Sequence, residues 1–226
     1  AAKSDPEQLK AWVNTSLGET WEETGETIDE TSLDRLREHY GPDDLPEDVV
    51  LATAGVDTQD DRLEVEIVGW GVGEESWGVV YRTIWGNPTT SDPWAELDDL
   101  LLTTWQARDG RQIRVAAACV DSGGHNADAV FRFTRERMRR RVWAIKGAGN
   151  VAGKSTPIWP QRASKANRGR DQVFSIGTDT AKDTVFARWS ISDGAGACHL
   201  PADRGTGYDD HWTAGAVSEQ RVTKYK

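Results

Sequence analysis

The chain has 226 residues, enough for one substantial hydrophobic core and too few for several ordinary domains. It has neither an apolar run of bilayer-spanning length nor the apolar segment of a signal peptide, so we expect no membrane partner and no export. Its formal net charge of −10 argues, taken alone, against a nucleic-acid partner. The two cysteines, Cys119 and Cys198, form no CxxC pair, which predicts reduced thiols in a cytosolic protein.

The charge is unevenly distributed along the chain. Between Arg132 and Arg170 there are twelve Lys and Arg and one acid, Glu136, a net charge of +11, so the rest of the chain carries −21. A charge run is usually only a solvated surface, but a block this one-sided suits a phosphate backbone. From this block and the later Lys182 we predict DNA contacts for Arg135, Arg139, Arg140, Arg141, Lys146, Lys154, Lys165, Arg168 and Lys182.

In chain order, residues 1–48 are polar and acidic and are predicted to be a linker or tail, and residues 49–226 the folded domain. The run 49–57 is almost entirely apolar, as in a central strand, whereas 62–71 alternates apolar residues with glutamates. A third strand follows at 76–86. The short links between the three runs predict antiparallel hairpins.

The next segments alternate helix and strand. Trp94, Leu97, Leu101 and Trp105 recur at helical spacing, and we then expect a strand at 111–121, a helix at 127–141 and a strand at 142–147. Three antiparallel strands, helix, strand, helix, strand is the order of the ribonuclease H-like fold, an α/β fold whose mixed sheet has three antiparallel strands plus two further strands, flanked by helices. In that fold the first and fourth strands lie side by side.

Two aspartates end the first and fourth strands. Asp57 closes VVLATAGVD and Asp121 closes IRVAAACVD. Either residue alone would more often be a simple turn residue. A pair held at the ends of neighbouring strands, however, can bind divalent metal, so we predict that Asp57 and Asp121 are catalytic residues and metal ligands.

A third carboxylate is harder to assign. Asp179 and Asp183 follow a strand at 173–176, on a helix expected to begin near 178–180 with Val185, Phe186 and Trp189 as its buried stripe. An acid in the first turn of a helix is favoured there by the helix dipole, so a capping role for Asp179 is as strong as a catalytic one. His199, Asp209, Asp210 and His211 are interpreted as surface loop residues.

Residues 148–155, AGNVAGKS, fit the loose pattern of a phosphate-binding Walker loop. Such a loop needs a helix directly after its Lys and Ser, because the helix N-terminus binds the phosphates. Pro157 and Pro160 stand where the first turns of that helix would be. We therefore reject a nucleotide site and assign Lys154 to a basic loop near DNA.

Several of these motifs occur together in one family. The chain resembles the C-terminal nuclease domain of phage terminase large subunits of the lambda GpA type in AGVDTQDDRLEVEIVGWGVGEESW, VDSGGH, RVWAIKG and IGTDTAKD, in that order. The segment NTSLGETWEE is similar to the junction that joins the packaging ATPase to the nuclease in this family. Residues 1–48 would then be the linker from an ATPase domain that this sequence lacks.

The resemblance implies a metal-dependent endonuclease that cuts concatemeric double-stranded viral DNA during genome packaging in the cytoplasm of an infected bacterium. It implies two Mg²⁺ or Mn²⁺ ions, the acids Asp57 and Asp121, and as partners DNA, the small terminase subunit and the portal. The family's third carboxylate belongs to a late helical motif that is absent here, so Asp179 or Asp183 would have to replace it. A Holliday-junction resolvase or integrase-like nuclease, and a DNA-gripping module without catalysis, are the alternatives.

Overall fold

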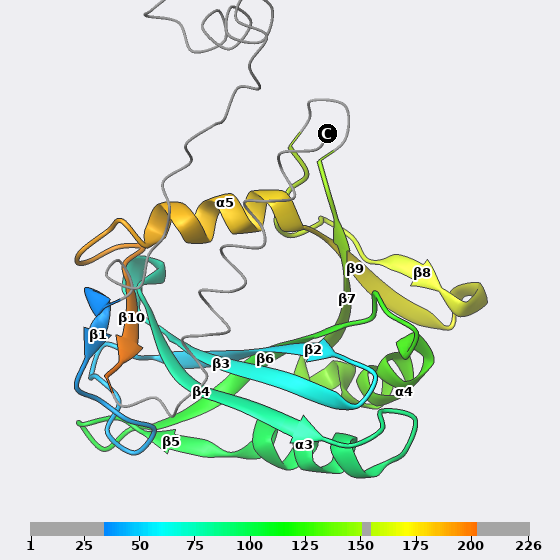
Figure 1. The fold of residues 1–226 in the computed structure, drawn as a ribbon, viewed down its shortest axis with the longest axis horizontal. Coiled ribbons are helices and arrows are strands. Elements are labelled where there is room, and N and C mark those ends of the chain that lie inside the picture. The colour runs from blue at the N-terminus through cyan, green and yellow to red at the C-terminus, as the bar shows by residue number, and fades with distance from the viewer. Residues whose placement is uncertain (1–33, 151–154, 203–226) are drawn as a thin grey trace, which may run out of the picture. The chain divides into compact units, whose positions relative to one another are not determined.

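The structure is a computed structural model that describes residues 34–150 and 155–202. Within these residues a mixed sheet runs in the order β1-β10-β4-β3-β2-β6-β7-β9-β8, and the short β5 pairs with β6 (Figure 1). The strands are β1 Arg37–Glu38, β2 Leu51–Thr58, β3 Arg62–Trp70, β4 Ser76–Trp85, β5 Thr104–Gln106, β6 Gln112–Asp121, β7 Val142–Ala148, β8 Ser164–Ala166, β9 Asp171–Gly177 and β10 Cys198–Pro201. The helices are α3 Asp92–Leu102, α4 Ala127–Arg137 and α5 Thr178–Arg188, with 3-10 turns η3 Val72–Glu74, η4 Met138–Arg140 and η5 Asn167–Gly169.

The centre of the sheet is the predicted antiparallel meander followed by parallel strands. β2 pairs antiparallel with β3, and β3 with β4. β6 then returns parallel to β2, β7 lies parallel to β6, and β9 lies parallel to β7. The expected α/β mixed sheet is therefore confirmed, and so is the adjacency of the first and fourth predicted strands.

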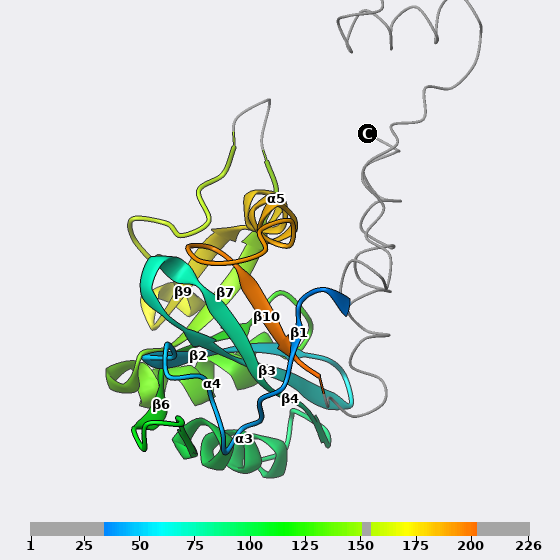
Figure 2. The same cartoon turned by 90° about the vertical axis from the view of Figure 1, so that its left-hand side faces the viewer.

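One face of the sheet forms the hydrophobic core. Leu63, Val65 and Ile67 of β3 are fully buried, whereas the glutamates between them are only partly covered. Helices α3 and α4 cover this face, and α5 lies on the other side of the sheet (Figures 1 and 2). Because strand side chains alternate between faces, each strand has a core side and a more open side. We call the side opposite α3 and α4 the open face.

The predicted boundary at residue 48 falls inside the packed domain. Tyr40 and Leu45 belong to the hydrophobic core, and β1 pairs with β10 from the far end of the described chain. Isolated apolar residues in an acidic segment carry no periodic signal, so the sequence did not separate them from a tail. Residues 1–33 of the expected tail lie outside the described residues.

Two local predictions about helices are corrected. The helix after residue 92 ends at Leu102, and Trp105 belongs to β5, because the following residues pair with β6 instead. In α5 no residue is buried, and Val185 is 38% exposed; Trp189, directly after the helix, is buried. None of the helices within 34–150 and 155–202 has both the length and the apolar character needed to cross a membrane.

Candidate functional site

Asp57 and Asp121 lie side by side at the ends of β2 and β6. In the parallel register Val56 pairs with Val120, and both valines are buried in the core. The residue that follows each valine therefore points to the open face. The two carboxylates are brought together as the sequence predicted, although their chemical role stays a prediction.

The electrostatics around Asp121 are unfavourable for a lone carboxylate. Partial burial, and next the charge of Asp57, raise the pKa of Asp121, while a hydrogen bond from the Gly123 N–H and the charge of Lys146 act in the opposite direction. The Gly123 nitrogen lies 3.0 Å from Asp121 Oδ1. A positive ion beside the pair would relieve this repulsion.

Gly123 also limits the space around Asp121. A Cβ atom at this position would lie 3.2 Å from Asp121 Oδ2 and 3.3 Å from Oδ1. Only a residue without a side chain brings its backbone N–H this close to the carboxylate without displacing it. The VDSGGH segment thus shapes the site as well as supplying its acid.

On the other side of the pair, Asp57 is held by Gln59, whose side-chain amide donates a hydrogen bond to Asp57 Oδ2. The backbone carbonyl of Gln59 accepts a hydrogen bond of 3.1 Å from Asn126 Nδ2, at the start of α4. The sequence did not reveal Gln59 and Asn126 as supporting residues, since no motif links a hairpin turn to a helix start 67 positions away.

A further carboxylate, Glu64, lies opposite Asp57 in the β2–β3 register and on the same open face. The charge of Glu64 is compensated by an ion pair with Arg62, whose Nε donates to Glu64 Oε1 at 2.7 Å. Tyr81 Oη donates a longer bond of 3.3 Å to the other oxygen. Glu64 is therefore a neighbour of the acid pair with partners of its own.

The structure does not bring Asp179 or Asp183 to the acid pair. Asp121 is level with Ile145 on β7 and Phe174 on β9, whereas Asp179 comes after β9 has run on to Gly177. Asp179 Oδ2 instead accepts a 2.7 Å hydrogen bond from the Asn150 N–H, a supporting role in the first turn of α5. Within the described residues no group of three or more His, Cys, Asp or Glu could hold a metal ion.

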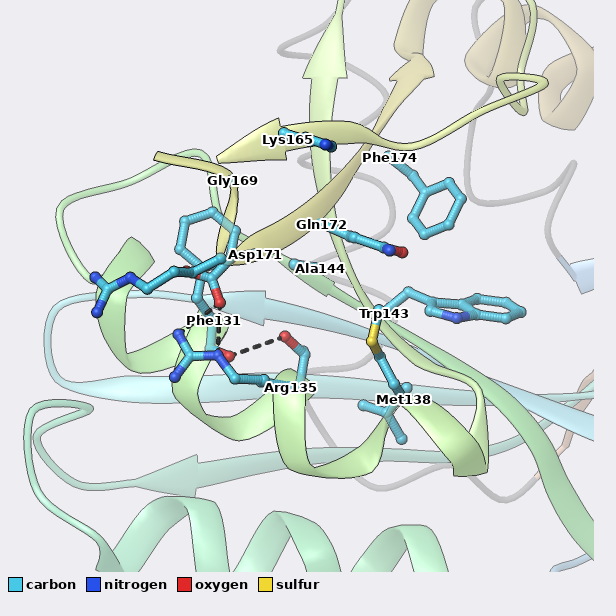
Figure 3. Close-up of a pocket in the computed structure, with 13 residues that line it drawn as sticks. Phe131, Arg135, Met138, Trp143, Ala144, Lys165, Gly169, Asp171, Gln172 and Phe174 are labelled. Carbon is cyan, nitrogen blue, oxygen red and sulfur yellow. Dashed lines mark hydrogen bonds and ion pairs between the residues drawn. The ribbon is translucent and has the colours of Figure 1, made fainter. Parts of the chain in front are cut away.

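The predicted DNA-binding cations separate into several groups. Arg135 binds Asp171 through Nε at 2.7 Å and Nη2 at 2.5 Å (Figure 3), and Arg140 binds Asp98 at 2.7 Å, so both are engaged within the fold. Arg139 and Arg141 precede the start of β7, at the end of the sheet opposite Asp121.

Lys146 is the cation nearest the acid pair. It directly follows Ile145, the β7 partner of Asp121, and its charge acts on the Asp121 carboxyl. Lys165 lies on the edge strand β8 and Lys182 on α5. Lys154 and the side chain of Arg168 lie outside what the structure describes.

The predictions about the loop at 148–155 and about the two cysteines can also be compared with the structure. The residues that directly follow Ser155 form no helix, as expected from the two prolines. Both cysteines are free, and burial raises the pKa of the Cys119 thiol to about 11.

His199 was wrongly placed in a surface loop. It is buried in β10, stacks on Trp77 and bonds Glu38 and Glu75 through its two ring nitrogens. Asp209, Asp210 and His211 lie outside the described residues.

The fold and the acid pair define a class of α/β domains that present carboxylates at the ends of adjacent parallel strands. Comparison with known proteins places the chain more narrowly. The family model described as "Terminase large subunit gpA, endonuclease domain" matches residues 1–226, so the chain belongs to this family.

Two relatives support the assignment. The chain is 35% identical over 205 residues to the terminase large subunit of Escherichia phage lambda, and the aligned region covers 88% of this chain and 31% of that protein. It is 34% identical over 209 residues to the terminase large subunit of Enterobacteria phage P21, covering 92% of this chain and 31% of that protein. The chain thus spans about a third of the length of these relatives. No solved structure matches.

Proposed function

We propose that this domain is a metal-dependent endonuclease with a ribonuclease H-like fold that cuts concatemeric double-stranded viral DNA during genome packaging. The observation that carries the proposal is the placement of Asp57 and Asp121 side by side at the ends of parallel strands. The strand order β4-β3-β2-β6-β7 supports the fold assignment, and membership in a terminase endonuclease family supports the reaction.

The donor set suits Mg²⁺ or Mn²⁺. Two carboxylates offer the hard oxygen ligands these ions prefer, and magnesium in phosphoryl enzymes is commonly held by one or two carboxylates together with phosphate oxygens and water. Two ions, when bound, would lower the pKa of an attacking water and stabilise the leaving oxygen. The raised pKa of Asp121 supports the proposal, because it marks a place where added positive charge is favourable.

The protein's own residues would hold the pair and the DNA in position. Gln59 fixes Asp57, and the Gly123 N–H fixes Asp121. Lys146, beside the pair, is positioned to bind a backbone phosphate, as are Lys165 and Lys182 farther out. Contacts with the phosphate backbone do not distinguish one base sequence from another. We therefore propose that the small terminase subunit and the portal determine where the DNA is cut, and that the reaction takes place in the cytoplasm of the infected host.

A DNA-gripping module without catalysis is the second candidate. It is favoured by one observation, that within the described residues no third acid is placed to share a metal ion with Asp57 and Asp121. The two candidates differ in whether the chain cleaves DNA and in whether metal matters.

Nicking of supercoiled plasmid tests the proposal. The chain is incubated with Mn²⁺, Mg²⁺ or a chelator, beside Asp57→Asn and Asp121→Asn, which keep shape and remove charge. We expect metal-dependent nicking that falls at least about a hundredfold in either variant.

The exposed Asp60 provides a matched control, since Asp60→Asn removes an equal charge from the nearby turn. Asp60→Asn should nick as the parent does. DNA binding without nicking by the parent at any metal concentration would instead select the gripping module. Nicking that survives in both site variants would reject the assigned acids.

A further inference from the structure

An exposed aromatic cluster lies on the open face of the sheet, outside the acid pair. Trp143 of β7, Phe174 of β9 and Trp159 of the preceding loop are mutually in contact. The Trp159 and Phe174 rings stack, with centroids 4.8 Å apart and an interplanar angle of 23°. Trp159 remains 44% exposed, although tryptophan is usually well buried. We call these three residues the aromatic cluster.

The sheet register places this cluster close to the acids. Asp121 is level with Ile145, and Ile145 with Phe174, so Phe174 lies two strands away in the same row as Asp121. Neighbouring strands are about 4.8 Å apart, which puts the Phe174 backbone about 10 Å from that of Asp121. At about 3.4 Å of rise per nucleotide in one B-form strand, this corresponds to about three nucleotides.

Polar groups that fit a nucleotide border the cluster. Gln172 and its cross-strand partner Lys165 are exposed. Their side chains make no hydrogen bond or ion pair with any other residue that the structure describes. Trp143, Phe174, Gln172 and Lys165 are among the residues that line a cavity of about 120 Å³, which also extends to Phe131 and Arg135 of α4. Figure 3 shows the Gln172 side chain near the Phe174 and Trp143 rings. An amide beside aromatic faces offers hydrogen bonds to a base edge, and a lysine offers its charge to a phosphate.

The loop that carries Trp159 is fixed by hydrogen bonds to its backbone carbonyls. The Gly177 N–H donates to the Pro157 carbonyl at 3.0 Å, and Thr180 Oγ1 donates to the Thr156 carbonyl at 2.7 Å. A Cβ at Gly177 would collide with both carbonyl oxygens, so the close approach depends on glycine at this position. The cluster is therefore held in place before any ligand arrives, which lowers the entropy cost of binding.

We propose that the aromatic cluster, with Gln172 and Lys165, binds unpaired bases of a DNA strand whose backbone continues to Asp57 and Asp121. The inference rests on the proposed nuclease function and extends it to a single-stranded segment beside the cut. Bases within a duplex are stacked on one another and leave no face for an aromatic side chain, whereas unpaired bases stack on such rings. The indole rings of Trp143 and Trp159 suit the base of that ligand, and the charge of Lys165 suits its phosphate.

The test measures binding in chelator, where cleavage is not involved. Fluorescence anisotropy compares a labelled single strand, its duplex, and a strand of the same length made of abasic sites. Trp159→Ala should weaken single-strand binding by about fivefold to a hundredfold, the effect of one lost stacked base. It should leave duplex and abasic binding unchanged, and Trp159→Phe should restore single-strand binding.

Trp85→Ala is the matched control, because Trp85 is 69% exposed on β4 and lies outside the cluster. It should bind all three ligands as the parent does. Three results would overturn the inference: no single-strand binding by the parent, an unchanged affinity in Trp159→Ala, or an equal loss on all three ligands. Plasmid nicking by the parent is scored separately, so a failed nuclease proposal and a failed base site give different results.

Discussion

The ion-paired acids of the covered side and the adjacent acids Asp57 and Asp121 of the open face differ in how their charges are balanced. On the covered side Asp98 of α3 accepts bonds from Arg137 and Arg140, and Asp171 binds Arg135. On the open face Asp57 and Asp121 lie next to each other, and like charges meet. Paired charges hold elements of the fold together, whereas an unpaired set of like charges costs stability and is typical of a functional site.

The pKa shifts on the two sides have opposite signs. Hydrogen bonds from Arg137 hold the pKa of Asp98 below its usual value despite partial burial. Burial alone would raise the pKa of Asp171, but bonds from Asn167 and Arg135 outweigh it and lower the pKa. At Asp121 burial and the charge of Asp57 prevail, and the pKa rises. Folding thus favours the charged form of the two covered acids and disfavours the charged form of Asp121.

The largest expected effect on stability comes from the covered side. Arg135→Ala leaves the Asp171 side chain, which is only 2% exposed, with Asn167 as its remaining hydrogen-bonding side chain among the described residues. Stranding a buried charge typically costs about 3 kcal/mol, so we expect a loss of that order in urea unfolding. Arg139→Ala removes an exposed cation and should change stability by less than about 0.5 kcal/mol. An equal loss of unfolding free energy in the two variants would show that the ion pair of Arg135 contributes no more to stability than an exposed arginine does.

Gly177→Ala should have the next largest effect, this time where the loop that carries Trp159 contacts the end of β9. The new methyl would meet the carbonyl of Pro157 at 2.7 Å as well as that of Thr156, so the loop or the strand end must move. Overpacking of this kind costs about 1–3 kcal/mol and should lower the melting temperature. Gly41→Ala, where nothing lies within 4 Å of the added Cβ, is the control. A melting temperature unchanged in Gly177→Ala would mean that the loop is not held as described.

Gly123→Ala should reduce activity with little effect on stability. The methyl would press on the Asp121 carboxylate from 3.2 Å and shift it by a few tenths of an ångström. Because small displacements of catalytic groups are costly, we expect plasmid nicking to fall by about tenfold at an unchanged melting temperature. Gly124→Ala, whose nearest neighbour would be 3.9 Å away, should nick normally. A normal rate in Gly123→Ala would show that the acid pair tolerates movement.

The smallest expected effect is a pH dependence on the covered side. Because the pKa of Asp98 is lowered by folding, its charged form adds stability above its unfolded pKa near 3.9, and this is lost as pH falls through the lower folded value. The difference in unfolding free energy between the parent and Asp98→Asn should therefore be full near pH 6 and shrink below about pH 4. Urea unfolding across this range measures it. A difference that does not vary with pH would assign the contribution of Asp98 to packing.

Much of the fold was accessible from the sequence because its signals are local. The apolar run before Asp57, the alternation in 62–71 and the helical spacing after residue 92 each fix an element over a few residues. Elements of two to four residues such as β1 and β10 give no comparable signal, since they are short and their pairing partners are remote in the chain. The packing of Tyr40 and Leu45 was missed for the same reason.

In the candidate site, too, the local features could be predicted from the sequence and the long-range contacts could not. Asp57 and Asp121 were found from strand ends, and a fold-level expectation predicted that they meet. The predicted set of DNA-binding cations was less accurate, because net charge alone does not reveal that Arg135 and Arg140 form ion pairs with Asp171 and Asp98. Which cations lie near Asp121 depends on strand direction, and among them Lys146 is placed beside it.

By itself the sequence determined the order of the main strands and helices, the two acids at strand ends and the separation of charge along the chain. Hydrophobic periodicity and composition act over short stretches, so these features need no knowledge of long-range contacts. Only the tertiary structure decided that Gln59 and Gly123 hold the acids, that two arginines are engaged in internal ion pairs, and that an aromatic cluster lies in the row of Asp121. The row of the aromatic cluster depends on the register between strands, which is set by packing across the whole sheet rather than by any local pattern. The two arginine ion pairs depend on how the helices pack against other elements. Gln59 and Gly123 lie only two residues from their acids, and their bonds depend on the conformation of the chain after Asp57 and after Asp121.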